Sequence, residues 1–222
     1  MSLVLREDGD GIVLLTLNRP DRRNALSGAL IEALIEALAG VAADPSARVA
    51  VLTGGGVAFC AGGDLADGMG ASDGLLAGHE RRGRFALLLH AIRDLRVPVI
   101  AAVNGDALGG GCGLAAACDL VVADPDARLG TPEIRLGLFP WIILAVLQRD
   151  VPRKALLEAV LTGEKWSAER ARELGLVNQV SAKGEVLVAA RALAARIAAA
   201  SPAVVALGKA AFHRIADQPL DD

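Results

Sequence analysis

Short apolar runs alternate with amphipathic segments along the whole chain, a pattern typical of a protein that combines strands and helices. Apolar positions in residues 3–7 and 12–17 alternate around Gly9-Asp10-Gly11, which predicts a β-hairpin. Three further apolar runs predict buried strands, over residues 49–53, 98–103 and 119–123. No linker-like or low-complexity stretch and no obvious repeat separates these elements, so the pattern indicates one α/β domain.

The amphipathic segments predict the helices. Ser27 is a residue type that caps helix N-termini, and the segment after it places five apolar side chains on one face: Leu30, Ile31, Leu34, Ile35 and Leu38. Thr131-Pro132-Glu133 predicts another helix start, with Thr131 as N-cap and Pro132 at the first helical position. Further helices are predicted over residues 81–95, 111–118, 141–148, 153–161, 167–173, 183–200 and 203–215.

Two glycine-rich corners, residues 57–65 and 104–114, each follow one of the apolar runs. Glycine has no side chain, so a backbone N–H in such a corner can approach a ligand closely. Two N–H groups that converge on one point would form an oxyanion hole. Glu133 lies shortly downstream and is the natural acid or base. Together these features predict the stabilisation of a thioester enolate.

Composition and charge exclude several classes of protein. The 222 residues are 53% hydrophobic and 22% charged, which describes a soluble globular chain that can form one domain. The net charge of −3 provides no basic field for nucleic acid. The three cysteines have no metal-ligand spacing, and their odd number argues against a disulfide framework. We expect them to be small core residues in a reducing compartment.

Sequence signals for other locations and other chemistries are missing. The first eight residues lack a signal-peptide pattern, and the longest apolar run, 138–147, is too short for a membrane span of ~20 residues. We therefore expect a cytoplasmic protein with no membrane contact. The histidines have no metal-ligand spacing and no Ser-His-Asp set accompanies the glycine corners. Neither a G-x-G-x-x-G motif nor a P-loop is present, which weakens dinucleotide and NTPase hypotheses.

Three blocks of the sequence resemble the enoyl-CoA hydratase/isomerase (crotonase) superfamily. They are LNRPDRRNAL (17–26), VLTGGGVAFCAGGDL (51–65) and PVIAAVNGDALGGGCGLAAACDLVVA (98–123), with support from residues 128–140 and 161–180. The resemblance implies an α/β, crotonase-like spiral of ββα units in residues 1–200. Residues 201–222 would begin a C-terminal helical oligomerisation region that is shorter than usual. The resemblance also implies a homotrimer, or a hexamer of two trimers.

The same resemblance assigns the catalytic groups. The backbone N–H groups of Gly63 and Gly110 would be the oxyanion donors, and the helix that begins near Gly111 would add its positive end. Glu133 matches the position of a family catalytic glutamate. In an apolar pocket its pKa should rise toward a useful working range.

The sequence departs from the family pattern at Gly113. Hydratases of the superfamily usually carry a second glutamate at the corresponding position, and the two carboxylates together hold and activate a water. One base suffices to move a proton between two carbons of an enolate, as a 3-enoyl to 2-enoyl isomerase does. Isomerisation is therefore favoured, while hydration stays possible if the substrate or another residue replaces the second carboxylate.

Coenzyme A is expected as part of the substrate, with no permanently bound cofactor and no metal. The resemblance places it near Arg23, Ala25, Ala61, Asp64 and Leu65. Ala66 stands where many relatives have a lysine that would contact it. Trp141 replaces a glycine that usually follows the proline, and its backbone N–H would still be able to bind a water or a substrate group. The bulky stretch 142–147 would either line the acyl pocket or simply pack in the core.

Two alternatives to an enoyl-CoA hydratase or isomerase stay open. The protein could be a non-catalytic acyl-CoA-binding or assembly subunit, which Gly113, Ala66 and the short C-terminal region would favour. It could also catalyse another reaction of a CoA thioester, such as hydrolysis or decarboxylation, since the superfamily hosts several chemistries.

Overall fold

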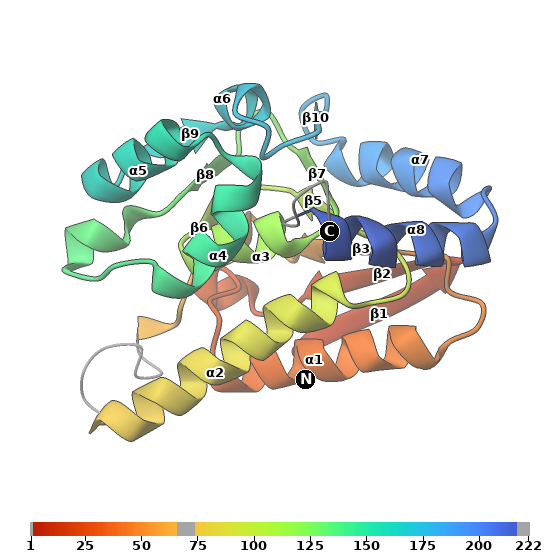
Figure 1. Ribbon diagram of the computed structural model, residues 1–222, viewed down its shortest axis with the longest axis horizontal. Coiled ribbons are helices and arrows are strands. Elements are labelled where there is room, and N and C mark those ends of the chain that lie inside the picture. Colours follow the sequence, from red (N-terminus) through yellow and green to blue (C-terminus); the bar gives the residue numbers. More distant parts are fainter. Residues whose placement is uncertain (1, 66–73, 217–222) are drawn as a thin grey trace.

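The computed structural model describes residues 2–65 and 74–216 and contains two sheets (Figure 1). The larger sheet has the order β1-β2-β3-β5-β7-β10. The hairpin strands β1 (Val4–Gly9) and β2 (Ile12–Leu17) are antiparallel, as the sequence predicts. The other strands run parallel to β2; they are β3 (Val49–Gly54), β5 (Val99–Val103), β7 (Leu120–Ala123) and β10 (Gln179–Val180).

The smaller sheet consists of short strands that the sequence pattern did not predict. Its order is β4 (Ala58–Cys60), β6 (Asp106–Leu108), β8 (Arg128–Gly130) and β9 (Lys165–Ser167). Each of β4, β6 and β8 directly follows a strand of the larger sheet, so the chain repeats a unit of two strands followed by a helical segment. The predicted spiral of ββα units is therefore confirmed. The first glycine corner begins with β4 and ends at Leu65, and the second is the place where the chain leaves β6 and enters a helix at Gly110.

The helices cover both faces of the larger sheet (Figure 1). They are α1 (Gly28–Ala43), α2 (Gly74–Arg93), α3 (Gly110–Ala117), α4 (Trp141–Asp150), α5 (Arg153–Thr162), α6 (Ala168–Glu173), α7 (Val186–Ala198) and α8 (Pro202–Ile215). On one face α7 packs its buried Val186, Ala190 and Ala194 against alternate residues of β2, β3, β5 and β7. The opposite face carries the main core beneath α1, α2 and α3. Because both faces are buried, the central strands are apolar at nearly every position.

The helix boundaries differ from the predictions in two informative places. Ser27 caps α1 as predicted, since its hydroxyl accepts a hydrogen bond of 3.2 Å from the Leu30 backbone N–H. The helix predicted over residues 81–95 begins earlier, at Gly74, and ends at Arg93. The segment after Thr131 is a short 3₁₀ helix, Pro132–Leu136. Thr131 is at its N-cap and Pro132 at its start, as predicted, although the Thr131 hydroxyl makes no capping hydrogen bond.

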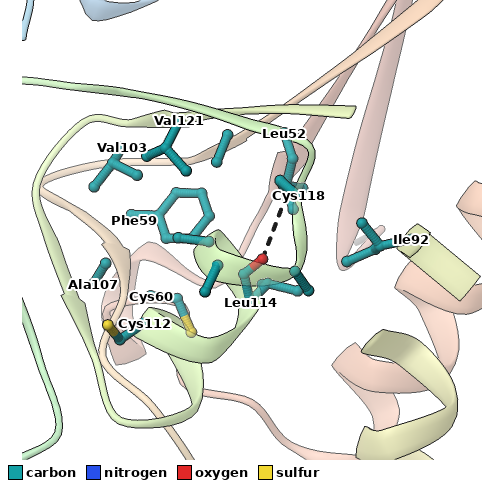
Figure 2. Close-up of a cluster of buried hydrophobic side chains, with 14 of the residues drawn as sticks. Leu52, Phe59, Cys60, Ile92, Val103, Ala107, Cys112, Leu114, Cys118 and Val121 are labelled. Carbon is teal, nitrogen blue, oxygen red and sulfur yellow. Dashed lines mark hydrogen bonds between the residues drawn. The ribbon is translucent and has the colours of Figure 1, made fainter. Parts of the chain in front are cut away.

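The three cysteines are free and buried in the core around Phe59, as the sequence analysis expected (Figure 2). Burial raises the pKa of the Cys60 and Cys112 thiols to about 12, so both are neutral at physiological pH. The Cys118 thiol donates to the Leu114 carbonyl at 3.4 Å. These residues therefore act as small hydrophobic side chains.

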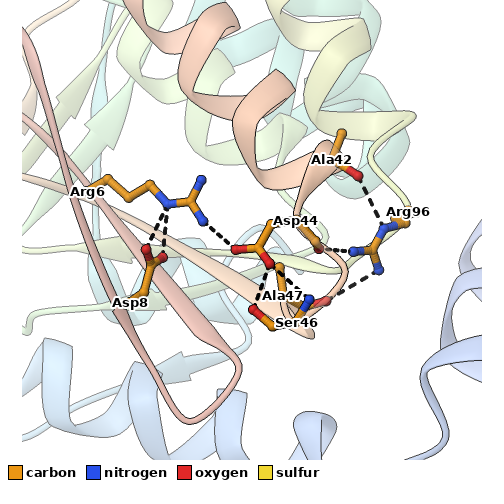
Figure 3. Close-up of polar contacts among 7 residues, drawn as sticks. All are labelled: Arg6, Asp8, Ala42, Asp44, Ser46, Ala47 and Arg96. Atoms are coloured by element: carbon orange, nitrogen blue, oxygen red, sulfur yellow. Dashed lines mark hydrogen bonds and ion pairs between the residues drawn. The ribbon is translucent and has the colours of Figure 1, made fainter.

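A polar cluster fixes the connection between α1 and β3 (Figure 3). Arg6 on β1 contacts Asp44 at 2.6 Å, and Asp44 also accepts hydrogen bonds from the hydroxyl and backbone N–H of Ser46 at 2.6 and 2.9 Å. The Ser46 hydroxyl, its backbone N–H and Arg6 lower the pKa of Asp44. Arg96, just before β5, donates to the Ala47 carbonyl at 3.3 Å. The cluster holds the end of α1 against the edge of the larger sheet.

Helix α8 is anchored by a buried cation. Lys209 is only 7% exposed and contacts Asp119 at 2.7 Å. Its ammonium group also donates to the carbonyl groups of Ile92 and Val97, both at 3.1 Å. His213, one turn further along α8, lies 2.9 Å from the second oxygen of Asp119. The helix is therefore attached to the core through one carboxylate.

We expect Lys209→Met to lower the free energy of unfolding by about 3 kcal/mol, because it leaves the Asp119 carboxylate without its buried counter-charge. Urea unfolding followed by circular dichroism measures this change. The matched control is Lys183→Met, which removes a lysine from an exposed pair with Asp126. That variant should unfold like the wild type. An equally small effect of Lys209→Met would show that the pair does not anchor α8.

Candidate active site

In the first glycine corner, the backbone N–H of Gly63 points away from the neighbouring loop that contains Leu26. Leu26 and Gly63 form an isolated parallel bridge, in which the Leu26 N–H donates to the Gly62 carbonyl at 2.8 Å. The Asp64 N–H in turn donates to the Leu26 carbonyl at 3.1 Å. Since successive N–H groups of an extended chain point in opposite directions, the Gly63 N–H points away from Leu26. It has no acceptor among the residues that the structure describes.

The second corner places another N–H beside the first. Gly109, with φ 54° and ψ −124°, adopts a backbone conformation that glycine tolerates and turns the chain from β6 into α3. Gly110 is the first residue of α3, so its N–H has no partner within the helix. A Cβ atom placed on Gly110 would lie 3.7 Å from the Gly63 backbone nitrogen. The two predicted oxyanion glycines are therefore immediate neighbours.

Glu133 approaches the same corner from the 3₁₀ helix Pro132–Leu136. A Cβ atom on Gly109 would lie 2.8 Å from Glu133 Oε1. The other oxygen, Oε2, is buried and has no hydrogen-bond partner in the described part of the chain. Burial raises the pKa of Glu133, although its own backbone N–H acts in the opposite direction. A shielded carboxylate thus lies one residue away from the Gly110 donor, which suits proton transfer.

A cavity of about 140 Å³ opens at the two glycines. Its described lining comes mainly from α1, α2 and the glycine corners, and consists of Leu26, Gly28, Ile31, Glu32, Gly63, Arg82, Arg84, Phe85, Gly110 and Ile142. Phe85 is 7% exposed, and a Cβ atom on Gly110 would lie 3.6 Å from its Cζ atom. Glu133 is not part of this lining and approaches the donors from the side of Gly109. The cavity is a mainly apolar space that begins at the two N–H groups.

Gly113 packs against hydrocarbon. A Cβ atom on Gly113 would lie 2.1 Å from Cγ2 and 2.6 Å from Cβ of Ile143, which is 3% exposed in α4. These distances are too short for any side chain at position 113 unless Ile143 moves. The place from which a second carboxylate would emerge is therefore filled by an isoleucine.

The loop before α1 is held by a residue that sequence reasoning missed. Asn24 is fully buried, and its side-chain amide donates to the carbonyl groups of Gly55 and Ala58 at 2.9 and 2.8 Å. Its φ of 55° is in the left-handed region, which asparagine tolerates better than most residues. Arg23, predicted to contact substrate, has an exposed side chain that pairs with Asp106 at 2.6 Å.

Two of the residues that were predicted to lie near coenzyme A use their backbone N–H groups inside the protein. The Ala61 N–H donates to the Arg23 carbonyl at 3.0 Å, and the Asp64 N–H donates to Leu26. The Asp64 carboxylate contacts Arg19 at 2.9 Å. Ala61 and Asp64 thus position the Arg23–Leu26 loop against the corner, and their N–H groups are not free to bind a substrate.

The remaining predicted coenzyme A contacts are Ala25 and Leu65, the last residue before the undescribed segment 66–73. Ala25 is half-buried beside the bridge to Gly63, and Leu65 is 57% exposed. Both positions are compatible with contact to a ligand. Ala66 lies outside the described residues.

Trp141 was predicted to offer its backbone N–H to a water or a substrate group, and the structure differs. Its side chain is 73% exposed, and its ring centroid lies 4.5 Å from that of Phe139. Its backbone N–H donates to the Phe139 carbonyl at 3.0 Å, so this group is not available for a water or a substrate. The next residue, Ile142, lines the cavity instead.

Other kinds of site find little support in the described residues. Within 2–65 and 74–216, no group of three His, Cys, Asp or Glu side chains is arranged to hold a metal ion. In the same ranges no single helix is long and apolar enough to cross a membrane. Helices α7 and α8 meet that test only as a pair, which is bent by 105°.

Comparisons with known proteins found similar proteins that cover nearly the whole chain. The family model for enoyl-CoA hydratase/isomerase matches residues 7–222, a range that contains every site residue described above. A putative enoyl-CoA hydratase of Thermus thermophilus is 40% identical over 215 residues, which are 95% of this chain and 84% of that protein. The 2,3-dehydroadipyl-CoA hydratase of Escherichia coli is 40% identical over 204 residues, 91% of this chain and 78% of that one. A crystal structure of an enoyl-CoA hydratase from Mycobacterium smegmatis has a TM-score of 0.95 and 43% identity, over 99% of this chain and 85% of that chain.

Proposed function

Because the chain belongs to the enoyl-CoA hydratase/isomerase family, we propose that it moves the double bond of a 3-enoyl-CoA to the 2-position, with Glu133 as the only carboxylate in proton transfer. The observation that carries this choice is the packing of Ile143 against Gly113. Where a hydratase of the family would hold its second glutamate, this protein has an isoleucine side chain. The described site therefore supplies one base.

The two glycine N–H groups would stabilise the charge that the reaction creates. Removing a proton from C2 of a 3-enoyl thioester moves negative charge onto the thioester oxygen. Donors fixed at that oxygen, here Gly63 and Gly110, contribute about 2.7–4 kcal/mol each in comparable sites. Gly110 also lies at the N-terminus of α3, whose dipole favours an anion there.

Glu133 would act as base and then as acid within one turnover. Its carboxylate takes the proton from C2, which leaves a dienolate, and the protonated carboxyl returns a proton to C4. The product has the mass of the substrate, and Glu133 ends as the carboxylate with which it began. Burial raises the pKa of Glu133, so the protonated intermediate is less unfavourable than for an exposed glutamate.

Hydration is the second candidate, because proteins 40% identical to this chain carry hydratase names. Hydration adds a hydroxyl group to C3 and a proton to C2 of a 2-enoyl-CoA. Glu133 would then have to activate the water without a second carboxylate. A carboxylate on the substrate itself is one group able to assist it.

The proposal extends to coenzyme A and to assembly. The Arg23–Leu26 loop and the exposed Leu65 border the Gly63 donor and would contact the coenzyme A part of the substrate. Helix α8 presents large apolar side chains to solvent, namely Val204, Leu207, Phe212 and Ile215. Such a surface fits the proposed oligomerisation region of a homotrimer or of a hexamer.

Product analysis by mass spectrometry tests the proposal. The purified protein is given a 3-enoyl-CoA and, separately, a 2-enoyl-CoA of the same chain length. An isobaric product from the 3-enoyl ester is the expected result, whereas a water adduct from the 2-enoyl ester would identify a hydratase. Loss of the acyl group or of carbon dioxide would indicate hydrolysis or decarboxylation. Binding without any product would support the non-catalytic acyl-CoA-binding subunit and overturn the proposal.

A further inference from the structure

The cavity has an inner and an outer end that are lined by different residue types. Phe85 lies beside Gly110 at the inner end. On α1 the lining runs from Gly28 to Glu32, about 6 Å further along the axis, since each helical residue adds about 1.5 Å. Glu32 pairs there with Arg84 of α2, and these two side chains are 43% and 48% exposed. The ion pair thus forms the solvent side of the cavity together with the exposed Arg82, which also lines it.

Between these ends the walls are hydrocarbon. Leu26, Ile31, Phe85 and Ile142 contribute apolar side chains. Walls of this kind offer no hydrogen bonds to the two amides of a pantetheine arm, and burying unpaired amides is costly. A hydrocarbon chain fits instead. An apolar cavity of about 150 Å³ holds a six-carbon ring, so this cavity of about 140 Å³ has a comparable capacity.

We infer that this cavity holds the acyl chain and that the Glu32–Arg84 ion pair limits its length to about six carbons beyond the thioester carbonyl. The position of the thioester in this inference rests on the proposed function. A longer chain must displace or dehydrate two charged side chains, which offsets the gain from burying more methylene groups. The hydrogen bond from Arg84 lowers the pKa of Glu32, so the pair stays ionised at neutral pH.

The test is a binding series with saturated acyl-CoA esters of four to fourteen carbons, measured by calorimetry, because binding needs no turnover. For the wild type, Kd should fall about fourfold for each added methylene group, the effect of burying it. The decrease should stop once the acyl group has more than about six carbons beyond its carbonyl. In Glu32→Leu/Arg84→Leu the decrease should continue for at least two further methylene groups, so that long esters bind at least about 16-fold tighter than to the wild type.

The matched control exchanges the two charges. Glu32→Arg/Arg84→Glu keeps an ion pair at the same place and should keep the wild-type break in the series. Free coenzyme A should bind all three proteins equally, which shows that the cavity does not hold the pantetheine arm. A break at the same chain length in the leucine variant, or weaker binding of free coenzyme A to it, would overturn the inference. If no ester is turned over, the proposed function fails, while this series still reports on the cavity.

Discussion

Replacing Glu133 by glutamine is expected to lower kcat by about 10²–10⁴-fold, the usual contribution of a positioned general base. Glutamine has the size of glutamate but cannot take a proton from C2. The oxyanion donors and the cavity are unchanged by this substitution, so Kd for a saturated acyl-CoA should stay close to that of the wild type. Glu133 Oε2 has no hydrogen-bond partner among the described residues, so the substitution breaks no described hydrogen bond of that oxygen.

Steady-state kinetics with the 3-enoyl-CoA, together with calorimetric binding, separates these two effects. Glu36→Gln is the matched control, because Glu36 is exposed on α1 and does not line the cavity. That variant should keep full activity. Wild-type turnover by Glu133→Gln would show that another group transfers the proton.

The same variant tests the electrostatic environment of the carboxylate. Burial raises the pKa of Glu133 in the folded protein, so the ionised base is lost at a higher pH than for an exposed glutamate. The acidic limb of kcat/KM against pH reports the ligand-free enzyme and should therefore lie above the range of an ordinary glutamate, with activity rising as pH increases. Between the ordinary and the raised pKa the folded state binds more protons than the unfolded state, so wild-type stability should fall with increasing pH in that window. Glu133→Gln should lack this dependence, which urea unfolding at several pH values measures.

Apart from the two-residue β10, the strands of the larger sheet were predictable, because β1 alternates before a glycine turn and the others are mostly apolar runs. The smaller sheet was not, because β4, β6 and β8 have three residues each, too few to show a period. Their register depends on pairing between segments that are far apart in the sequence. The two glycine corners contain β4 and β6, but their glycines were interpreted mainly as positions where a backbone N–H can approach a ligand.

The candidate site likewise combines residues that were recognised in the sequence with contacts that form only in the folded chain. The glycine corners and the glutamate downstream of them are recognisable in the local sequence, and the family resemblance then singled out Gly63, Gly110 and Glu133. The packing of Ile143 on Gly113 and the ion pair between Glu32 and Arg84 arise only when distant helices meet. The sequence shows that position 113 has no carboxylate. It does not show that Ile143 fills the space beside Gly113, because no local pattern indicates which distant side chain packs there.

Replacing Gly110 by alanine is expected to lower kcat/KM by about 10²–10³-fold, the loss reported when one oxyanion donor is removed. The new methyl group would lie 3.7 Å from the Gly63 nitrogen and 3.0 Å from Leu26 Cδ1. It would therefore occupy the space that the thioester oxygen needs in order to reach both donors. The φ of Gly110 is not among the positive values in this chain, so alanine fits the backbone, and Leu26 has to shift by only a few tenths of an ångström.

Folding and catalysis should consequently respond differently to this substitution. Gly208→Ala is the matched control, since Gly208 lies within α8 and a Cβ atom there would contact nothing within 4 Å. It should keep full activity and gain about 0.5–1 kcal/mol of stability from the better helix propensity of alanine. Gly110→Ala should unfold close to the wild type in urea, while its turnover is strongly reduced. If both variants were fully active, the thioester oxygen would not bind between Gly63 and Gly110, and the glycines would serve only the tight packing of the corner.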